Sequence, residues 1–225
     1  MSTVCILKYI QKAERQYMWI NPLFSAEVRD ALRDLARSSS LATLVAEGPL
    51  RAAHMPVLVE EDEAGELLIL GHIPRADPLS KAIQEGQDIL CIFHGPRAYV
   101  SAGWYEKVGL STYNYSVAHL RGRSEEMSEE DLESHLTQLI KMHEQNKEPS
   151  DGGEWQFDEA AQARFEILLP KVLGYRIRVS DAQAKEKIGQ NRSAEDRAMT
   201  VTQLAESSQE EHLDMADLMK KREER

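Results

Sequence analysis

The stretch GHIPRADPLSKAI at residues 71–83 contains side chains that could bind a phosphate group. Arg75 lies in an expected loop, and Ser80 and Lys81 follow Pro78 at the start of a short predicted helix. The first turn of a helix presents free N–H groups and a partial positive charge, which attract anions. Arg75, Ser80 and Lys81 therefore form a candidate phosphate clamp. The alternative is an ordinary helix start with two exposed cations and Asp77 as its N-cap.

A second candidate site is the aromatic segment HGPRAYVSAGWY at residues 94–105, followed by Tyr113 and Tyr115. Only 6% of the chain is aromatic, yet several of its rings gather here. Rings that lie outside strands line pockets for flat ligands more readily than rings within strands do. A phosphate clamp together with flat side chains fits flavin mononucleotide (FMN) better than a simple sugar phosphate. The alternative is a local packing cluster.

Other chemistry has no recognisable motif in this sequence. The histidines form no HExxH motif, and neither a GxSxG motif nor a Walker A loop occurs. Cys5 and Cys91 belong to no CxxC pair, so we expect no zinc or iron–sulfur site. Cys91 lies in an apolar run, which predicts a buried structural thiol.

Short strands separated by turns must position these residues. Hydrophobic periodicity predicts strands at 41–46, 51–60, 67–73, 88–94, 98–102, 115–123 and 172–179, with a Gly-Pro turn at 95–96. It predicts helices at 25–37 with Ser25 as the cap, and at 78–85, 128–145 and 158–168, and a helical, polar chain after Ser180. This order is typical of a mainly β (α+β) fold in which the strands form a closed or partly closed barrel with flanking helices.

The charge balance limits the classes of partner. The chain has 27 Lys and Arg against 38 Asp and Glu, a net charge of −11. Affinity for phosphate backbones and anionic lipids comes mainly from basic residues, so non-specific binding to DNA or membranes is not expected. No long apolar stretch and no signal-peptide pattern is present, which indicates a cytoplasmic protein. Beyond Ser207 charges of both signs dominate, typical of a surface helix or a frayed tail.

Together these motifs are similar to the PaiB-type family of FMN-binding negative transcriptional regulators, which have a flavin-reductase-like split β-barrel. The resemblance covers residue 18 to about residue 200. Asp77 stands where the family usually has Asn. We therefore expect an N-terminal extension at 1–17, a split-barrel FMN-binding domain at 18–206 and a charged tail at 207–225. The motifs that carry the resemblance are MWINPLF (18–24), LATLV (41–45), AHMP (53–56), GHIPRADP (71–78), FHGPRAYVSAGWYEK (93–107), STYNYSVAHLRG (111–122) and GYRIRV with KIGQNRSAEDR (174–197).

The resemblance implies a homodimer with the flavin at its interface, in which Tyr99, Trp104 and Tyr105 belong to the dimer core. The FMN-binding residues that it implies are His54 and Met55 beside the isoalloxazine, His72, Arg75, Ser80 and Lys81 around the phosphate, Tyr113, Asn114 and Tyr115 from the partner subunit, and Gln190, Asn191 and Arg192 in a segment that closes the site.

The leading hypothesis is an FMN-binding homodimer that its family links to negative regulation of transcription. No helix-turn-helix with a basic face is present, so direct DNA contact is not expected and regulation could pass through a protein partner. The first alternative is an NAD(P)H-dependent flavin reductase or small-molecule oxidoreductase, because bound flavin supplies hydride chemistry. The second is a haem-binding module with His54, His72, His94 or His119 as the axial ligand. The third is a structural dimer that has lost its cofactor. No catalytic residue is assigned.

Overall fold

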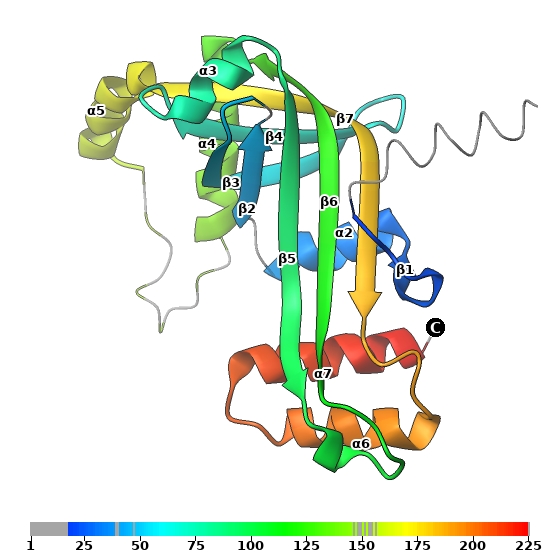
Figure 1. Cartoon of the computed structure of the whole chain (residues 1–225). Coiled ribbons are helices and arrows are strands. Elements are labelled where there is room, and N and C mark those ends of the chain that lie inside the picture. Colours follow the sequence, from blue (N-terminus) through cyan, green and yellow to red (C-terminus); the bar gives the residue numbers. More distant parts are fainter. Residues whose placement is uncertain are drawn as a thin grey trace, which may run out of the picture. The chain divides into compact units, whose positions relative to one another are not determined.

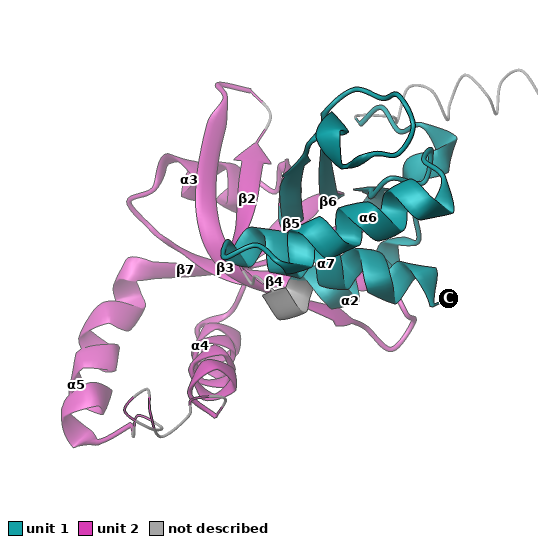
Figure 2. Ribbon diagram, turned by 90° about the horizontal axis from the view of Figure 1, so that it is seen from below, with its two compact units in different colours: residues 1–39, 93–119, 181–225 teal, residues 40–92, 120–180 magenta. Residues whose placement is uncertain are grey.

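The computed structural model describes residues 18–38, 41–46, 48–145, 147, 150, 152, 155 and 157–224. The predicted extension at 1–17 lies outside these residues. The chain divides into two compact units, coloured separately in Figure 2. We call residues 40–92 and 120–180 the barrel unit, and residues 1–39, 93–119 and 181–225 the helix unit. Three long strands, β5 (Asp88–Val100), β6 (Thr112–Glu126) and β7 (Val172–Lys187), contribute residues to both units.

Six strands form a closed ring in the barrel unit. They are β2 (Leu41–Ala46), β3 (Arg51–Glu61), β4 (Leu67–Pro74) and the parts of β5, β6 and β7 that belong to this unit. The neighbour order is β7-β4-β3-β2-β5-β6, and β6 also pairs with β7, which closes the ring. The registered pairs are antiparallel; Leu44, for example, lies opposite Ala53 on one side and Cys91 on the other. The predicted barrel with flanking helices is confirmed.

Alternating side chains fill the barrel interior, as the period of two in the sequence predicts. Leu44, Ile69, Cys91 and Ile177 are completely buried, and Cys91 is a free thiol as expected. Gly122 of β6 lies against β7. A Cβ atom at this position would be 2.0 Å from the backbone oxygen of Arg178, so only glycine lets the two strands approach this closely.

Three helices complete the barrel unit: α3 (Pro78–Gln84), α4 (Glu129–Glu144) and α5 (Glu159–Leu168), the last followed by the turn η4 (Leu169–Lys171). The side chains of Asp77, Ser128 and Asp158 accept hydrogen bonds from the first-turn N–H groups of α3, α4 and α5 respectively. These caps satisfy donors that a helix start leaves free. The three predicted helices are therefore confirmed, and their starts agree with the predicted ones to within one residue.

The helix unit contains η1 (Pro22–Phe24), β1 (Ser25–Ala26), α2 (Val28–Ser38), η2 (Ala102–Trp104), α6 (Ala194–Ala205) and α7 (Glu210–Glu223). Helices α6 and α7 pack side by side (Figure 1). Their apolar faces enclose a core with the end of β5, formed by Ala98, Ile188, Leu204, Met215 and Met219. Residues 210–223 were predicted as a surface helix or a frayed tail. They form a helix, with Met215, Ala216, Leu218 and Met219 buried.

Three sequence predictions are wrong in this region. Gly95 and Pro96 form no turn, because β5 continues through them to Val100 and thus includes most of the separate strand predicted at 98–102. Gly95 is needed for packing rather than for a turn, since a Cβ there would be 2.3 Å from a methyl group of Leu35. Ser25 lies in β1, so it does not cap α2.

The chain after Ser180 is also not helical at first, because β7 continues to Lys187. The charged residues Lys185 and Glu186 looked typical of a solvated helix, yet both are buried. Within the described residues, no helix is long and apolar enough to cross a membrane.

Candidate functional site

His54 and Met55 lie on β3 of the barrel unit. His54 is exposed, and its Nδ1 lies 3.0 Å from the hydroxyl oxygen of Thr43 on the neighbouring strand β2. Met55 is half-buried. Both residues can therefore be reached from the surface of the barrel unit, as a ligand contact requires.

The predicted phosphate clamp at the start of α3 is largely satisfied by the protein itself. The Asp77 carboxylate accepts from the backbone N–H of Leu79 at 2.8 Å. The Ser80 hydroxyl donates to the backbone oxygens of Arg75 and Asp77, at 2.9 and 2.7 Å. The negative charge of Asp77 therefore lies at the positive end of the helix dipole, and the Ser80 hydroxyl donates its proton to the backbone. This helix start does not fit a phosphate.

The two cations of the clamp remain exposed. Arg75 forms an ion pair with Glu126 at 2.8 Å, and Lys81 forms one with Glu85 at 3.7 Å. Exposed pairs of this kind contribute at most about 1 kcal/mol, so an anion can compete with the carboxylates. Arg75 and Lys81 therefore fit a phosphate, whereas Asp77 and Ser80 do not.

His72 lies away from this clamp. Its Nδ1 is 3.4 Å from the Nε2 of His135 on α4, and the two rings are tilted at 58°. Burial lowers the pKa of His72, and burial together with the charge of His72 lowers the pKa of His135 to about 4. Sequence reasoning missed His135, whose partner is distant in the chain.

Tyr113, Asn114 and Tyr115 lie on β6 in the helix unit and alternate between its two faces. The side chain of Tyr113 is 58% exposed and makes an edge contact with Tyr99. Asn114 is buried, and its amide donates to the sulfur of Met219 at 3.6 Å. The two tyrosines can therefore contact a ligand, whereas Asn114 is part of the core.

Gln190, Asn191 and Arg192 follow β7. The amide of Gln190 accepts from the backbone N–H of Ile188 at 2.9 Å and donates to the backbone oxygen of Glu186 at 2.5 Å, so it caps the strand end. Asn191 is exposed. Of the twelve predicted cofactor residues, six lie in the barrel unit and six in the helix unit.

Arg192 pins the loop between β5 and β6. Its guanidinium lies 4.3 Å above the ring of Tyr105 and donates to the backbone oxygen of Leu110 at 3.2 Å. Gly109 lies against this contact, where a Cβ would be 2.7 Å from the Arg192 Nη1 and 2.8 Å from the ring of Tyr105. Trp104 packs against the α6–α7 core of its own unit.

Sequence reasoning missed Lys185 and Lys187, which lie two residues apart on the same face of β7. Lys185 Nζ lies 5.2 Å from the ring of Trp19 and 5.3 Å from the ring of Tyr115. Lys187 Nζ donates to the backbone oxygen of Tyr113 at 2.8 Å. We call Lys185, Lys187 and Arg192, with these rings, the cationic face. The two-residue spacing of the lysines was the available signal, and it was hidden by the wrong helix prediction.

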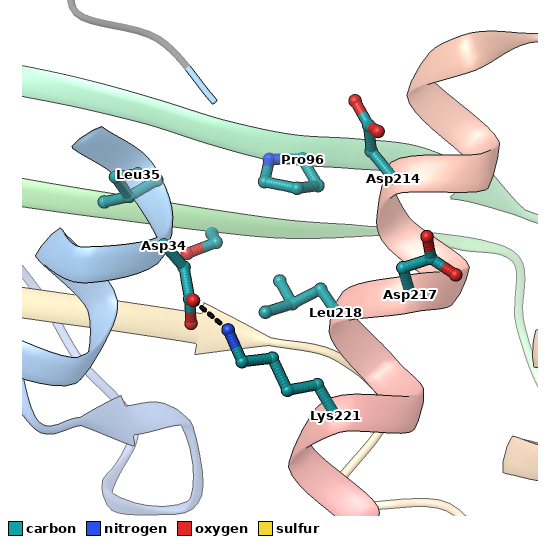
Figure 3. Close-up of a pocket in the computed structure, with 8 residues that line it drawn as sticks. Asp34, Leu35, Pro96, Asp214, Asp217, Leu218 and Lys221 are labelled. Carbon is teal, nitrogen blue, oxygen red and sulfur yellow. Dashed lines mark hydrogen bonds and ion pairs between the residues drawn. The ribbon is translucent and has the colours of Figure 1, made fainter. Parts of the chain in front are cut away.

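The helix unit also contains pockets. One of about 430 Å³ is bordered by Arg197 and Arg222, which are paired with Glu223 and Glu186 at 2.7 Å. Another, of about 200 Å³, lies between α2 and α7 and is bridged by the ion pair of Asp34 with Lys221 (Figure 3). Ligand pockets typically measure about 300–1,000 Å³, so the second pocket is too small for a flavin.

The histidines proposed as haem ligands belong to both units. His54 and His72 belong to the barrel unit, His94 and His119 to the helix unit. Burial and the charge of His94 lower the pKa of His119. Among the described residues, no group of three or more His, Cys, Asp or Glu could hold a metal ion.

The family model described as "Putative FMN-binding domain" matches residues 18–181 of this chain. The chain belongs to this family. The FMN-binding-domain match includes every strand of the ring in the barrel unit.

The chain is similar to the Protease synthase and sporulation protein PAI 2 of Bacillus subtilis (strain 168). It is 26% identical over 204 residues, which cover 90% of this chain and 96% of that protein. An uncharacterized protein of Aspergillus fumigatus is 23% identical and covers 77% of this chain and 83% of its own length. The chain is thus a PaiB-like split-barrel protein of the FMN-binding-domain family.

A solved structure with a similar fold is the FAD and Heme binding protein from Mycobacterium smegmatis. It has a TM-score of 0.52 and 18% identity, and the match covers 77% of this chain and 78% of that one. At this identity the similarity supports the fold and leaves the ligand to the chemistry of this chain's own residues.

Proposed function

We propose that this protein binds FMN and works as a homodimer. The observation that carries the proposal is the match of an FMN-binding domain, residues 18–181, onto a closed six-stranded barrel. FMN would supply hydride and electron transfer, while the protein binds and orients it.

On the barrel unit, Arg75 and Lys81 would hold the phosphate, and His54 and Met55 would lie beside the ring system. The exposed ion pairs of Arg75 and Lys81 support this assignment, because their carboxylate partners can be replaced at a cost of about 1 kcal/mol or less. The capped start of α3 contributes no attraction.

A partner subunit would contribute the aromatic wall. Tyr99 and Tyr113 support this part of the proposal, because their rings contact each other and these residues are 47% and 58% exposed in the single chain. Neighbouring exposed aromatic rings are typical of surfaces that bind another molecule.

The regulatory role of the PaiB-type proteins would act through a protein partner rather than through DNA. The net charge of −11 supports this choice, because DNA affinity depends on Lys and Arg. Retention of a random-sequence DNA duplex by the purified protein at physiological salt would contradict it.

The test is an absorbance spectrum of the full chain after incubation with FMN and desalting, together with the mass in solution by light scattering. We expect flavin bands on a dimer, and weaker bands for the Arg75→Met/Lys81→Met double variant. Lys141→Met is the control, because it removes an exposed cation on α4 of the same unit. A colourless wild-type protein would overturn the proposal. Steady NAD(P)H oxidation by the flavin-loaded protein would instead identify an oxidoreductase.

A further inference from the structure

Three cations gather in the helix unit without a carboxylate partner among the described residues. They are Lys185 and Lys187 on β7 and Arg192 just beyond it, none of which has an ion pair there. By contrast, Arg97 and Arg222 of the same unit are each paired with a glutamate at 2.8 and 2.7 Å. In a chain with a net charge of −11, uncompensated cations are unexpected.

Lys185 is the most unusual of the three. The residue is only 8% exposed, and its ammonium group donates to the backbone oxygen of Trp19 at 3.3 Å. The ammonium group also lies over the rings of Trp19 and Tyr115, 5.2 and 5.3 Å from their centres. Burying an ammonium group without an opposite charge is costly, so a nearby anion would stabilise this arrangement.

Lys187 is held beside it by neutral acceptors. Its ammonium group donates to the hydroxyl of Thr112 and to the backbone oxygen of Tyr113. Burial, and then the charges of Lys185 and Arg192, lower the pKa of Lys187. The three cations therefore repel one another, and a bound anion would relieve that repulsion.

Flat side chains lie against these charges. The ring of Trp19 lies 5.2 Å from Lys185 Nζ and is 72% exposed, and Tyr113, whose backbone oxygen accepts from Lys187, has a side chain that is 58% exposed. Large aromatic residues are usually buried. Cations next to accessible rings fit a ligand that has both a phosphate and a planar ring system.

We propose that the cationic face binds the phosphate of a nucleotide with a planar ring, with Lys185, Lys187 and Arg192 on the phosphate and Trp19 and Tyr113 against the ring. Two sources share this chemistry: the phosphates of a nicotinamide dinucleotide, and the 5′-phosphate of FMN, which at this face would replace Arg75 and Lys81 as its ligands in the proposed function. The FMN source rests on the proposed function, whereas the anion site itself does not.

The first test uses inorganic pyrophosphate, titrated calorimetrically into the full chain. We expect Lys187→Met and Arg192→Met each to weaken binding about tenfold, the loss of one charge-assisted contact. Lys220→Met removes an exposed cation of the same unit and should leave the affinity unchanged. Circular dichroism verifies that each variant is folded. Equal affinity for pyrophosphate in the wild type and both folded variants, or no binding at all, would overturn the proposal.

The second test identifies the source. If Lys187→Met weakens FMN binding and leaves riboflavin binding unchanged, the site takes the flavin phosphate. If it weakens NADPH binding and leaves FMN retention unchanged, the site takes the dinucleotide. Either result supports the inference, and a variant that binds both ligands as the wild type does would overturn it. Pyrophosphate binding in a protein that does not bind FMN would refute the proposed function and leave the anion site standing.

Discussion

The Nδ1 atom of His72 and the Nε2 atom of His135 lie 3.4 Å apart in the barrel unit, a contact between β4 and α4. One ring must donate and the other accept, so this contact requires that they are not both protonated. His135 is 3% exposed, which leaves little water to solvate a positive charge.

This pair predicts that stability falls as the pH is lowered. The pKa of His135 in the folded protein, about 4, is below its ordinary value of 6.5. Between these pH values the unfolded chain binds a proton that the folded chain does not, so folding stability decreases from pH 6.5 down to about 4. The loss attributable to this residue is about 3 kcal/mol.

Urea unfolding of the wild type and His135→Gln at several pH values between 7 and 4 measures this effect. We expect the variant to show the smaller loss of stability over this range. His143→Gln is the matched control, because His143 lies on the same helix and is exposed. Parallel curves for the wild type and His135→Gln would show that the pair is not the cause.

Gly122→Ala should prevent normal closure of the barrel. The new Cβ would lie 2.0 Å from the backbone oxygen of Arg178 and 2.9 Å from the Cα of Val179, and backbone atoms cannot rotate away. We expect a loss of about 3 kcal/mol or more in the free energy of unfolding. Gly103→Ala is the control, since its Cβ would meet only the Ser101 hydroxyl at 3.4 Å. Equal denaturation midpoints for the two variants would contradict the role of Gly122.

Arg222→Met should destabilise the helix unit through Glu186. The guanidinium makes two contacts of 2.7 Å with the Glu186 carboxylate and one of 2.7 Å with Asp34. Without it, Glu186 keeps a buried charge, which typically costs about 3–5 kcal/mol. Thermal or urea unfolding measures the loss.

Arg97→Met provides the comparison, because its pair with Glu211 is exposed and should contribute at most about 1 kcal/mol. The double variant Arg222→Met/Glu186→Leu should recover much of the lost stability, since it removes the buried charge as well. If the double variant is no more stable than Arg222→Met, the unpaired Glu186 is not the reason.

Asp77→Asn should strengthen FMN binding without loss of stability. Asn caps a helix as well as Asp does, and the substitution removes a negative charge near the proposed phosphate. Coulomb repulsion across a few ångströms of water-like medium is about 1 kcal/mol, so the dissociation constant should fall about fivefold. Flavin-fluorescence titration checks this, with Asp62→Asn in the β3–β4 turn as the control for net charge. Unchanged FMN affinity would place the phosphate elsewhere.

The sequence predicted the barrel well because its strands are local patterns. The strands at 41–46, 51–60 and 67–73 agree with β2, β3 and β4 to within a residue. The errors came where long-range contacts decide the structure. Gly95 is read as a turn residue unless one knows that Leu35 packs against it.

The same limit applied to the candidate site. Glu186 looked solvated because its partner Arg222 lies 36 positions away in the sequence. Once β7 was cut short, Lys185 and Lys187 could not be placed on one strand face. Arg75 and Lys81 were predicted from a local signal, a loop followed by a helix, and both are exposed in the structure. Asp77 and Ser80 are hydrogen-bonded to the backbone around the helix start.

The buried thiol of Cys91 can be used to measure how often the barrel opens. Burial raises the pKa of this thiol, so the reactive thiolate is almost absent while the ring of strands is closed. A thiol reagent in native buffer can therefore modify Cys91 only during transient openings of the barrel. With Cys5 replaced by serine, the labelling rate of Cys91 measures local unfolding of the barrel. Any ligand that binds the closed barrel should lower this rate.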